Sequence, residues 1–281
     1  MIAVCPNPFR DTELALTKQA VRLLEENGFT TAVCPVFVDN DSEVIPSGIS
    51  ACRIQDIAQD CSLAVVIGGD GTLLAVARQL RAYSLPVLGV NLGTKGFMAA
   101  LEPDDLPQIV NAARGEGELS RRMMLDVALI RNGKVIYTDC ALNDAVIHGY
   151  GDCVNITAWC NGERMTGFSG DGVILSTPTG STGYSMSAGG PIVEPDAENI
   201  ILSPICAHVM GARTFVLGPT RQITIKTEKL HGRRAYLSVD GNSVFDLANG
   251  DTVTVKRSEH YTQMINLGIK SFYEIAYEKL S

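Results

Sequence analysis

The chain is short of positive charge. Its 281 residues contain 23 Lys and Arg against 31 Asp and Glu, which gives a formal net charge of −8 at pH 7. A protein that binds nucleic acid along a broad face needs clustered Lys and Arg to neutralise the phosphates. The densest basic clusters here are only pairs, Arg121-Arg122 and Arg233-Arg234. The composition therefore argues against a nucleic-acid partner.

Long hydrophobic runs are also missing. No window approaches the roughly 20 apolar residues that a helix needs to cross a bilayer. The chain opens MIAVCPNPFR, and this segment has no basic stretch ahead of its short apolar run, so it does not look like an export signal. We therefore expect a soluble, cytoplasmic protein with no membrane partner.

Cysteine is present, but not in a pattern that suits zinc. No two cysteines are separated by two residues, and no histidine spacing matches a zinc site. We expect no metal site built from protein side chains alone. In a cytoplasmic protein the thiols are expected to be reduced, and most to be small core residues: Cys5, Cys34, Cys52, Cys61, Cys140, Cys153, Cys160 and Cys206.

Strand and helix signals alternate over residues 1–100. Short apolar runs of the parallel-sheet type are separated by stretches with helical spacing. This pattern predicts a layered, Rossmann-like α/β domain. The strand candidates are Ile2 to Cys5, Thr31 to Val38, Leu63 to Ile67 and Pro86 to Val90, and the helix candidates are Thr12 to Asn27, Ile49 to Asp60 and a stretch from Thr72.

The pattern changes from about Arg121, where alternating apolar and polar runs are separated by Asn-Gly and Asp-Gly turns. We therefore expect a β-rich, sandwich-like domain over residues 101–259. Helical spacing returns at Ile269 to Leu280, and residues 260–281 are expected to fold back and complete the first domain. With 46% hydrophobic residues, the chain can bury two modest cores.

The run LAVVIGGDGTLL, from Leu63 to Leu74, leads a buried strand through a glycine loop into a helix. The free amides at the start of such a helix attract anions. Asp70 would repel a polyphosphate there unless it takes a proton from an attacking hydroxyl or shares a metal ion with the phosphates. The motif therefore indicates phosphoryl transfer with Asp70 as the candidate base. The alternative is a tight turn in which Asp70 only acts as a cap.

Two better-known phosphate motifs do not match this loop. No lysine followed by Ser or Thr comes after its last glycine, and Leu74 stands where a dinucleotide fingerprint has its third glycine. A second glycine loop, from Gly89 to Phe97, follows the next strand, and both loops are expected to face one crevice. Its Lys95 could approach a phosphate as a point charge, or could be a solvated surface residue.

A third polar segment follows a strand at Gly172 to Ser176. Seven of the eight residues from Thr177 to Tyr184 are Thr, Ser, Gly or Pro, so amides, hydroxyls and one phenol are gathered together. A base and a ribose could bind there. The alternative is an ordinary polar loop between strands.

In five ordered blocks the chain closely resembles the NAD kinases of the ATP-dependent bacterial type. The blocks are GGDGT at Gly68 to Thr72, NLGTKGF at Asn91 to Phe97, ALND at Ala141 to Asp144, GDGVILSTPTGSTGYSMSAGGPIV at Gly170 to Val193, and PICAH at Pro204 to His208. GGDGT is also similar to the loop of diacylglycerol and sphingosine kinases, which lack the long threonine-glycine block. The resemblance implies a NAD kinase/diacylglycerol kinase-like fold. It also implies transfer of the γ-phosphoryl of ATP to the 2′-hydroxyl of the adenosine ribose of NAD, which makes NADP.

The resemblance also implies residue roles. Asp70 would lie beside the 2′-hydroxyl as general base, with the phosphates lined by Gly68, Gly69, Gly71 and Thr72. The implied NAD site comprises Asn143, Asp144, Asp171, Thr182, Gly183, Tyr184, Ser187 and, as an apolar contact or a core residue, Phe97. Asp144 stands where many relatives have Glu, and Gly183 stands where Ala is commoner.

The cofactor and partners follow from the same resemblance. A divalent cation, most simply Mg²⁺ carried in with ATP, would neutralise the phosphates, because the loops offer few cations. The partners would be NAD, ATP and further copies of the chain in a homodimer or homotetramer. Two other functions stay open: another small-molecule or lipid kinase with the GGDGT loop, and a non-catalytic NAD-binding regulator.

Overall fold

A computed structural model describes residues 1–280 except 40–41, 94–95, 210, 229 and 231. The contacts within the chain divide it into two compact units, Met1–Arg121 with Tyr261–Ser281, and Arg122–His260. Residues 101–121, which the sequence analysis assigned to the β-rich domain, belong to the first unit. They do so because their helical turns pack against the helices and parallel strands of that unit.

The first unit contains a parallel sheet in the order β2-β1-β3-β4. Its strands are β1 (Ile2–Pro6), β2 (Thr31–Val33), β3 (Leu63–Gly68) and β4 (Val87–Asn91). Strands β1, β3 and β4 are buried along their whole length, as is typical of a sheet covered on both faces. Pro6, Gly68 and Asn91 end at the same edge of this sheet, so the loops that follow them start together.

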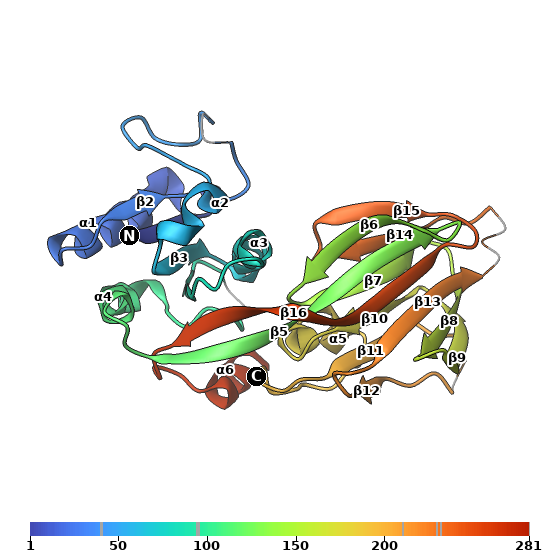
Figure 1. Ribbon diagram of the computed structural model, residues 1–281. Coiled ribbons are helices and arrows are strands. Elements are labelled where there is room, and N and C mark those ends of the chain that lie inside the picture. Colours follow the sequence, from blue (N-terminus) through green and yellow to red (C-terminus); the bar gives the residue numbers. More distant parts are fainter. Residues whose placement is uncertain (40–41, 94–95, 210, 229, 231, 281) are drawn as a thin grey trace. The chain divides into compact units, whose positions relative to one another are not determined.

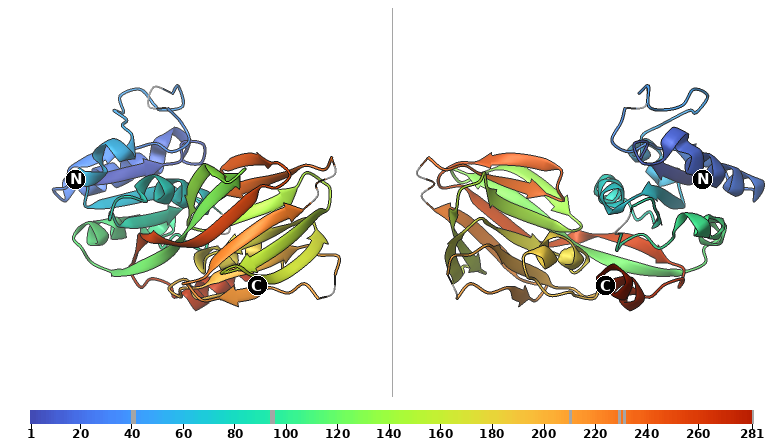
Figure 2. Two further views of the ribbon diagram at one scale, coloured as in Figure 1. Left: turned by 45° about the vertical axis from the view of Figure 1, so that its right-hand side comes forward. Right: turned by 180° about the vertical axis from the view of Figure 1, so that it is seen from behind.

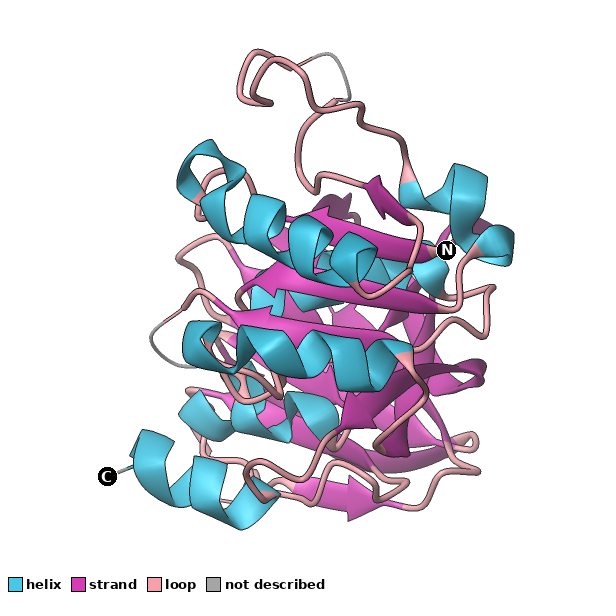
Figure 3. Cartoon of the chain, turned by 90° about the vertical axis from the view of Figure 1, so that its left-hand side faces the viewer, coloured by secondary structure: helices cyan, strands magenta, loops and turns pink. Residues whose placement is uncertain are grey.

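Helices lie alongside these strands (Figure 3). Ala20 and Leu24 of the first helix pack into one apolar core with Ile2 and Val4 of β1. The helices are α1 (Ala15–Glu26), α2 (Ile54–Ile57), α3 (Asp70–Leu80), α4 (Ile109–Ala113) and α6 (Phe272–Leu280), and the 3-10 turns are η1 (Thr12–Leu14), η2 (Ala58–Asp60) and η3 (Pro103–Gln108). None of the helices that the described residues form has the length and apolar character of a membrane span.

Two elements are shorter than the sequence predicts. The strand predicted over Thr31 to Val38 ends at Val33, shortly before Pro35, which has no N–H to donate to a ladder. The helix predicted over Ile49 to Asp60 begins only at Ile54. Its first residues are extended instead, because Ala51 forms a parallel bridge with Val33 at the sheet edge.

The second unit is β-rich and mostly antiparallel. One of its sheets has the order β12-β11-β10-β7-β14-β15, and a second group of strands is ordered β16-β13-β8-β9 with the hairpin β5-β6. The strands are β5 (Glu118–Arg131), β6 (Lys134–Ala141), β7 (Asp144–Gly149), β8 (Val154–Cys160), β9 (Glu163–Gly170), β10 (Gly172–Ser176), β11 (Ile200–Ile205), β12 (Phe215–Leu217), β13 (Gln222–Glu228), β14 (Ala235–Val239), β15 (Ser243–Leu247) and β16 (Thr252–Asn266).

Tight hairpin turns shape this unit as the sequence predicts. Both residues of the Asn132-Gly133, Asn161-Gly162 and Asp240-Gly241 pairs have positive φ, a backbone conformation typical of tight hairpin turns that match the right-handed strand twist. Strands β5 and β16 are far apart in sequence but pair and lie side by side (Figures 1 and 2). The predicted fold class, an α/β domain followed by a β-rich domain, is confirmed.

Candidate functional site

The GGDGT loop joins a buried strand to a helix. Strand β3 ends at Gly68 and α3 begins at Asp70, with Gly69 between them as the cap. The backbone N–H of Thr72 donates to the Gly69 carbonyl at 2.9 Å, which closes the turn. A side-chain carbon at Gly68 would lie only 2.7 Å from the Cβ of Thr72, so the turn depends on glycine there.

Asp70 connects the two glycine loops. Its carboxylate accepts the backbone N–H groups of Phe97 at 2.9 Å and Met98 at 3.2 Å. Burial raises the pKa of Asp70, while these two hydrogen bonds and the positive charge of Lys279 oppose the rise. The result is a carboxylate held in one orientation whose basicity is greater than that of an exposed aspartate.

The two loops form one cavity of about 420 Å³, as the sequence predicts. Its wall comes from the ends of the four parallel strands of the first unit and from the loops that follow them. The residues that line it are Asn7, Arg10, Phe37, Gly69, Asp70, Gly71, Thr72, Asn91, Gly93 and Gly96.

Arg10 brings a guanidinium to this cavity, and sequence reasoning missed it. A side-chain carbon at Gly69 would lie 3.9 Å from the Cζ of Arg10, and one at Gly93 would lie 3.5 Å from its Nη1. The sequence predicts Lys95 as the residue that brings positive charge to the phosphates, and Lys95 lies outside the described residues. Arg10 could have been found from its place after β1, because the carboxyl ends of neighbouring parallel strands share one edge.

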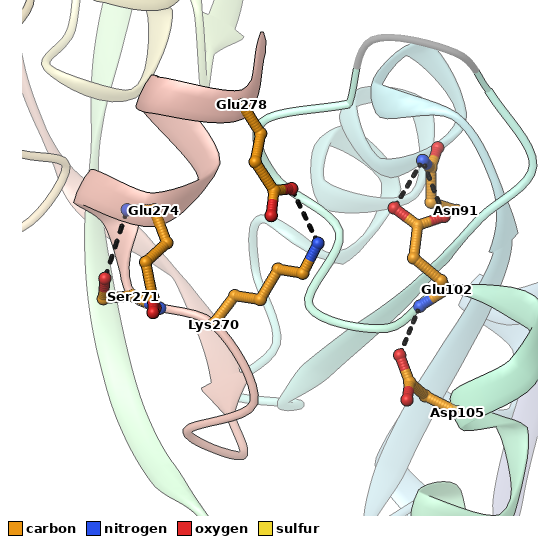
Figure 4. A network of polar contacts seen from close by, with 7 residues as sticks. All are labelled: Asn91, Glu102, Asp105, Lys270, Ser271, Glu274 and Glu278. Carbon is orange, nitrogen blue, oxygen red and sulfur yellow. Dashed lines mark hydrogen bonds and ion pairs between the residues drawn. The ribbon is translucent and has the colours of Figure 1, made fainter.

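Polar side chains hold the loops around the cavity. Asn7 donates to the Thr72 hydroxyl at 3.2 Å. The side-chain NH₂ of Asn91 donates to the Gly93 carbonyl at 3.0 Å and to the Glu102 carboxylate at 3.2 Å, and its oxygen accepts the Gly93 N–H at 2.8 Å. Figure 4 shows the Asn91–Glu102 hydrogen bonds and, in the C-terminal segment, the Lys270–Glu278 ion pair. The second glycine loop is thereby fixed at its start.

Asn143 and Asp144 belong to a tightly held loop of the second unit. Asp240 accepts three consecutive backbone N–H groups, from Leu142 at 2.7 Å, Asn143 at 2.8 Å and Asp144 at 2.9 Å. The Thr177 hydroxyl donates to the Leu142 carbonyl at 2.6 Å. This loop and the hydroxyl-rich segment therefore form one structure.

The pKa values of Asp144 and of the Asp240 carboxyl that holds its loop are both raised. Burial raises the pKa of Asp144 to about 7, with the negative charge of Asp240 as a second cause. Burial also raises the pKa of Asp240, to about 6, against the three N–H bonds that favour its ionised form. Near neutral pH, Asp240 therefore carries the charge and Asp144 holds or releases a proton.

The hydroxyl-rich segment is partly helical, with η4 (Thr179–Thr182) and α5 (Tyr184–Ser187) separated by Gly183. A side-chain carbon at Gly180 would lie 2.7 Å from the carbonyl carbon of Asn143, so the two backbones touch. Tyr184 exposes 41% of its surface and is available to a ligand.

Three buried polar atoms in this region have no hydrogen-bond partner within the described part of the chain. They are the Asn143 side-chain oxygen and the hydroxyls of Ser176 and Thr179. Buried polar atoms are nearly always paired, so unpaired ones point to water or a ligand. They lie beside Thr177 and Gly180, so this region of the second unit has polar groups that water or a polar ligand can pair.

The other sequence-predicted residues are distributed between the units. Asp171 follows β9, and its N–H donates to the Ile205 carbonyl at 3.0 Å. Thr182 bonds the Thr179 carbonyl at 3.3 Å, and Ser187 ends α5. Phe97 belongs to the first unit, where its backbone N–H contacts Asp70. Among the described residues no group of three His, Cys, Asp or Glu is arranged to hold a metal ion.

Comparison with known proteins identifies relatives over the whole chain. Residues 2–116 match the family described as the ATP-NAD kinase N-terminal domain, and residues 142–267 match the ATP-NAD kinase C-terminal domain. A curated NAD kinase of Acetivibrio thermocellus is 35% identical over 284 residues, which cover 99% of this chain and 96% of that protein. A NAD kinase of Geobacter metallireducens is 39% identical over 83% of this chain and 82% of its own.

The solved structures that the chain matches are also kinases of NADH or NAD. The chain matches the crystal structure of yeast NADH kinase complexed with NADH with a TM-score of 0.81 and 26% identity, over 97% of this chain and 84% of that chain. A NAD kinase from Archaeoglobus fulgidus in complex with ATP shares the fold, with a TM-score of 0.78 and 23% identity, over 100% of this chain and 98% of that chain.

Proposed function

The chain belongs to the ATP-NAD kinase family, and we propose that it transfers the γ-phosphoryl group of ATP to the 2′-hydroxyl of the adenosine ribose of NAD. The products are NADP and ADP. The observation that carries the catalytic part of this proposal is the Asp70 carboxylate, which is fixed by two backbone N–H groups at the wall of a cavity that also contains Arg10.

Asp70 is the general base in this proposal. As the oxygen of the 2′-hydroxyl bonds to the γ-phosphorus, its proton passes to the Asp70 carboxylate and ADP leaves. A positioned base of this kind contributes about 10²- to 10⁴-fold to a rate. The raised pKa of Asp70 favours the transfer, and the Phe97 and Met98 amides keep the carboxylate aimed at the cavity.

The phosphates of ATP are proposed to bind at the glycine loop. Gly69 and Gly71 leave the backbone bare, and the start of α3 presents amides that favour anions. Gly68 and Thr72 act through the shape of the turn, because they pack against each other. Arg10 supplies a positive charge, and its planar guanidinium can bond two phosphate oxygens at once. Lys95 stays a proposed phosphate contact.

Mg²⁺ is proposed to arrive as part of the ATP substrate. In proteins this ion is usually bound by one or two carboxylates together with substrate phosphates. Asp70 is a carboxylate at the wall of the cavity, so the residues present fit an ion of this kind. Bound there, Mg²⁺ would neutralise charge on the phosphates.

The NAD site is proposed to lie in the second unit, at the loop of Asn143 and Asp144. The support is the set of unpaired polar atoms next to the hydroxyl-rich segment, because a ribose and an amide can pair them. The residues proposed to contact NAD are Asn143, Asp144, Asp171, Thr182, Gly183, Tyr184 and Ser187, with Phe97 from the first unit. We also propose a cytoplasmic homodimer or homotetramer, which light scattering of the purified protein tests.

One assay tests the activity. The purified protein is incubated with ATP, Mg²⁺ and NAD, and NADP is measured with an NADP-specific dehydrogenase. Formation of NADP with equal release of ADP supports the proposal. Phosphorylation of a lipid or another alcohol in place of NAD would assign a different kinase activity, and binding of NAD without ADP release would assign a regulator.

A further inference from the structure

Three cysteines lie in a row across neighbouring parallel strands of the first unit. Val4 pairs with Val33, and Val33 pairs with Ala51. The next residue along each of these segments is a cysteine: Cys5, Cys34 and Cys52. Residues in register on parallel strands point to the same face, so Cys34 lies between the other two thiols.

Cys34 and Cys52 are in direct contact. Their sulfur atoms are 3.6 Å apart, and the backbone N–H of Cys52 donates to the Val33 carbonyl at 3.0 Å. Neighbouring strands lie about 4.8 Å apart, which falls within the Cα separations that disulfides bridge. The backbone therefore already has the spacing of a disulfide, and only the side chains need to rotate.

Cys34 could form a disulfide with Cys5 or with Cys52, and these two thiols differ in solvent exposure. Cys5 has no exposed surface and Cys34 has 2%, whereas Cys52 is partly exposed. A small oxidant in solution reaches Cys52 first, and Cys34 is the thiol that Cys52 contacts. Cys61 is also partly exposed, and within the described part of the chain its sulfur makes no hydrogen-bond contact with another thiol, so it serves as a matched control.

The segment between the two cysteines reaches the phosphate cavity. From Cys34 the chain continues along β1, with Val36 donating to the Pro6 carbonyl at 2.8 Å. Phe37 then turns away with φ at +69° and lines the cavity with Arg10 and Asp70. A change at Cys34 is therefore three residues from the cavity wall.

We propose that Cys34 and Cys52 are a reversible disulfide site whose closure weakens ATP binding at the cavity. The oxidant is a small-molecule disulfide. The Cys52 thiolate attacks one sulfur of that disulfide and releases the first small thiol. Cys34 then attacks the Cys52 sulfur and releases the second. The two cysteines lose two electrons and two protons in total, and the small disulfide is reduced to two thiols.

ATP binding is expected to weaken because disulfide formation brings the two sulfur atoms closer together. Bond formation shortens the sulfur separation from 3.6 Å to about 2.0 Å, which draws Cys34 toward Cys52 and away from β1. Phe37 follows in the same segment and shifts at the cavity wall. This part of the inference rests on the proposed binding of ATP there.

The test is run at alkaline pH, because burial raises the pKa of Cys52 to about 11 and the hydrogen bond with the Cys5 thiol raises the pKa of Cys34. Exchange proceeds through the thiolate, so it is faster there. The protein is incubated with glutathione disulfide, free thiols are alkylated, and the digest is mapped by mass spectrometry. We expect a Cys34–Cys52 cross-link in the parent and in Cys61→Ser, and none in Cys52→Ser.

ATP binding is then measured by equilibrium dialysis, without reference to catalysis. We expect the oxidised protein to bind ATP about fivefold more weakly, at the low end of measured coupling between sites, with recovery after reduction and no change in treated Cys52→Ser. Absence of the cross-link, a Cys5–Cys34 bond in its place, or unchanged ATP binding in fully cross-linked protein overturns the inference. Reduced protein that fails to bind ATP contradicts the proposed function instead, and the cross-link map is read independently of it.

Discussion

Asp70 and Phe97 are joined across two loops, because the Asp70 Oδ2 atom accepts the backbone N–H of Phe97 at 2.9 Å. Met98 makes a second bond to the same carboxylate at 3.2 Å. The group proposed to take the substrate proton therefore also orders the second glycine loop. Substitutions at Asp70 will affect both chemistry and loop position, and they have to be compared with a control.

Asp70→Asn is expected to lower kcat by about 10²-fold or more while NAD binding stays nearly unchanged, because a neutral amide cannot act as the base. NADP formation at saturating substrates and NAD binding by calorimetry measure the two effects. Asp104→Asn, at an exposed position of the same unit, is the control and should behave as the parent. Turnover close to normal in Asp70→Asn would remove Asp70 from the mechanism.

Arg10→Ala is expected to raise the KM for ATP by about tenfold and leave the KM for NAD unchanged, since charged hydrogen bonds to a phosphate are among the stronger ones. Arg10→Lys should recover only part of this, because an ammonium cannot bond two oxygens in one plane. Steady-state kinetics with each substrate varied separates the two constants. Arg22→Ala, an exposed arginine of α1, serves as the matched control. Equal increases in both KM values would contradict a role specific to phosphate.

Gly68→Ala is expected to lower the stability of the fold, whereas Gly71→Ala is expected to weaken ATP binding. A Cβ at Gly68 meets Thr72 at 2.7 Å, whereas nothing lies within 4 Å of one at Gly71. We expect Gly68→Ala to lower the free energy of unfolding by about 1 to 3 kcal/mol, as overpacking does. Gly71→Ala should keep its stability or gain up to about 1 kcal/mol from helix propensity. It should nevertheless bind ATP more weakly, because its methyl group enters the cavity.

Urea unfolding and ATP binding measured on both glycine variants distinguish these outcomes. If Gly71→Ala binds ATP as the parent does, the phosphates do not approach the loop at that position.

The stability of the protein should fall as the pH rises through about 7, because burial raises the pKa of Asp144 to about 7 from a usual 3.8. The folded protein holds this proton more tightly than the unfolded chain, so the stabilisation is present at low pH and is lost on deprotonation. The expected loss in unfolding free energy is roughly 2 to 3 kcal/mol between about pH 5 and pH 8.

Asp144→Asn should reduce this dependence and be more stable than the parent at the alkaline end, since it removes a buried charge next to Asp240. Urea denaturation across the pH range measures it. The exposed Asp152→Asn should keep the parental profile. A variant at Asp144 with the same slope as the parent would show that another group titrates.

Local sequence was sufficient for several features. The buried apolar run that became β3 and the glycine turn after it could be predicted because strand burial and tight turns depend on neighbouring residues. The positive φ angles at Asn132-Gly133 follow from the same local chemistry. Asp70 could be named as a candidate base from its place in the loop.

Only the tertiary structure decided which side chains lie next to each other, because these contacts depend on which strands become neighbours. Arg10 reaches Gly69 only because β1 and β3 pair, and Cys34 meets Cys52 only because Ala51 joins the sheet edge. The raised pKa of Asp144 depends first on its burial and then on the charge of Asp240, which lies 96 residues away in sequence. Periodicity and turn residues set the local conformation, but burial and charge proximity arise from long-range packing that no local pattern encodes.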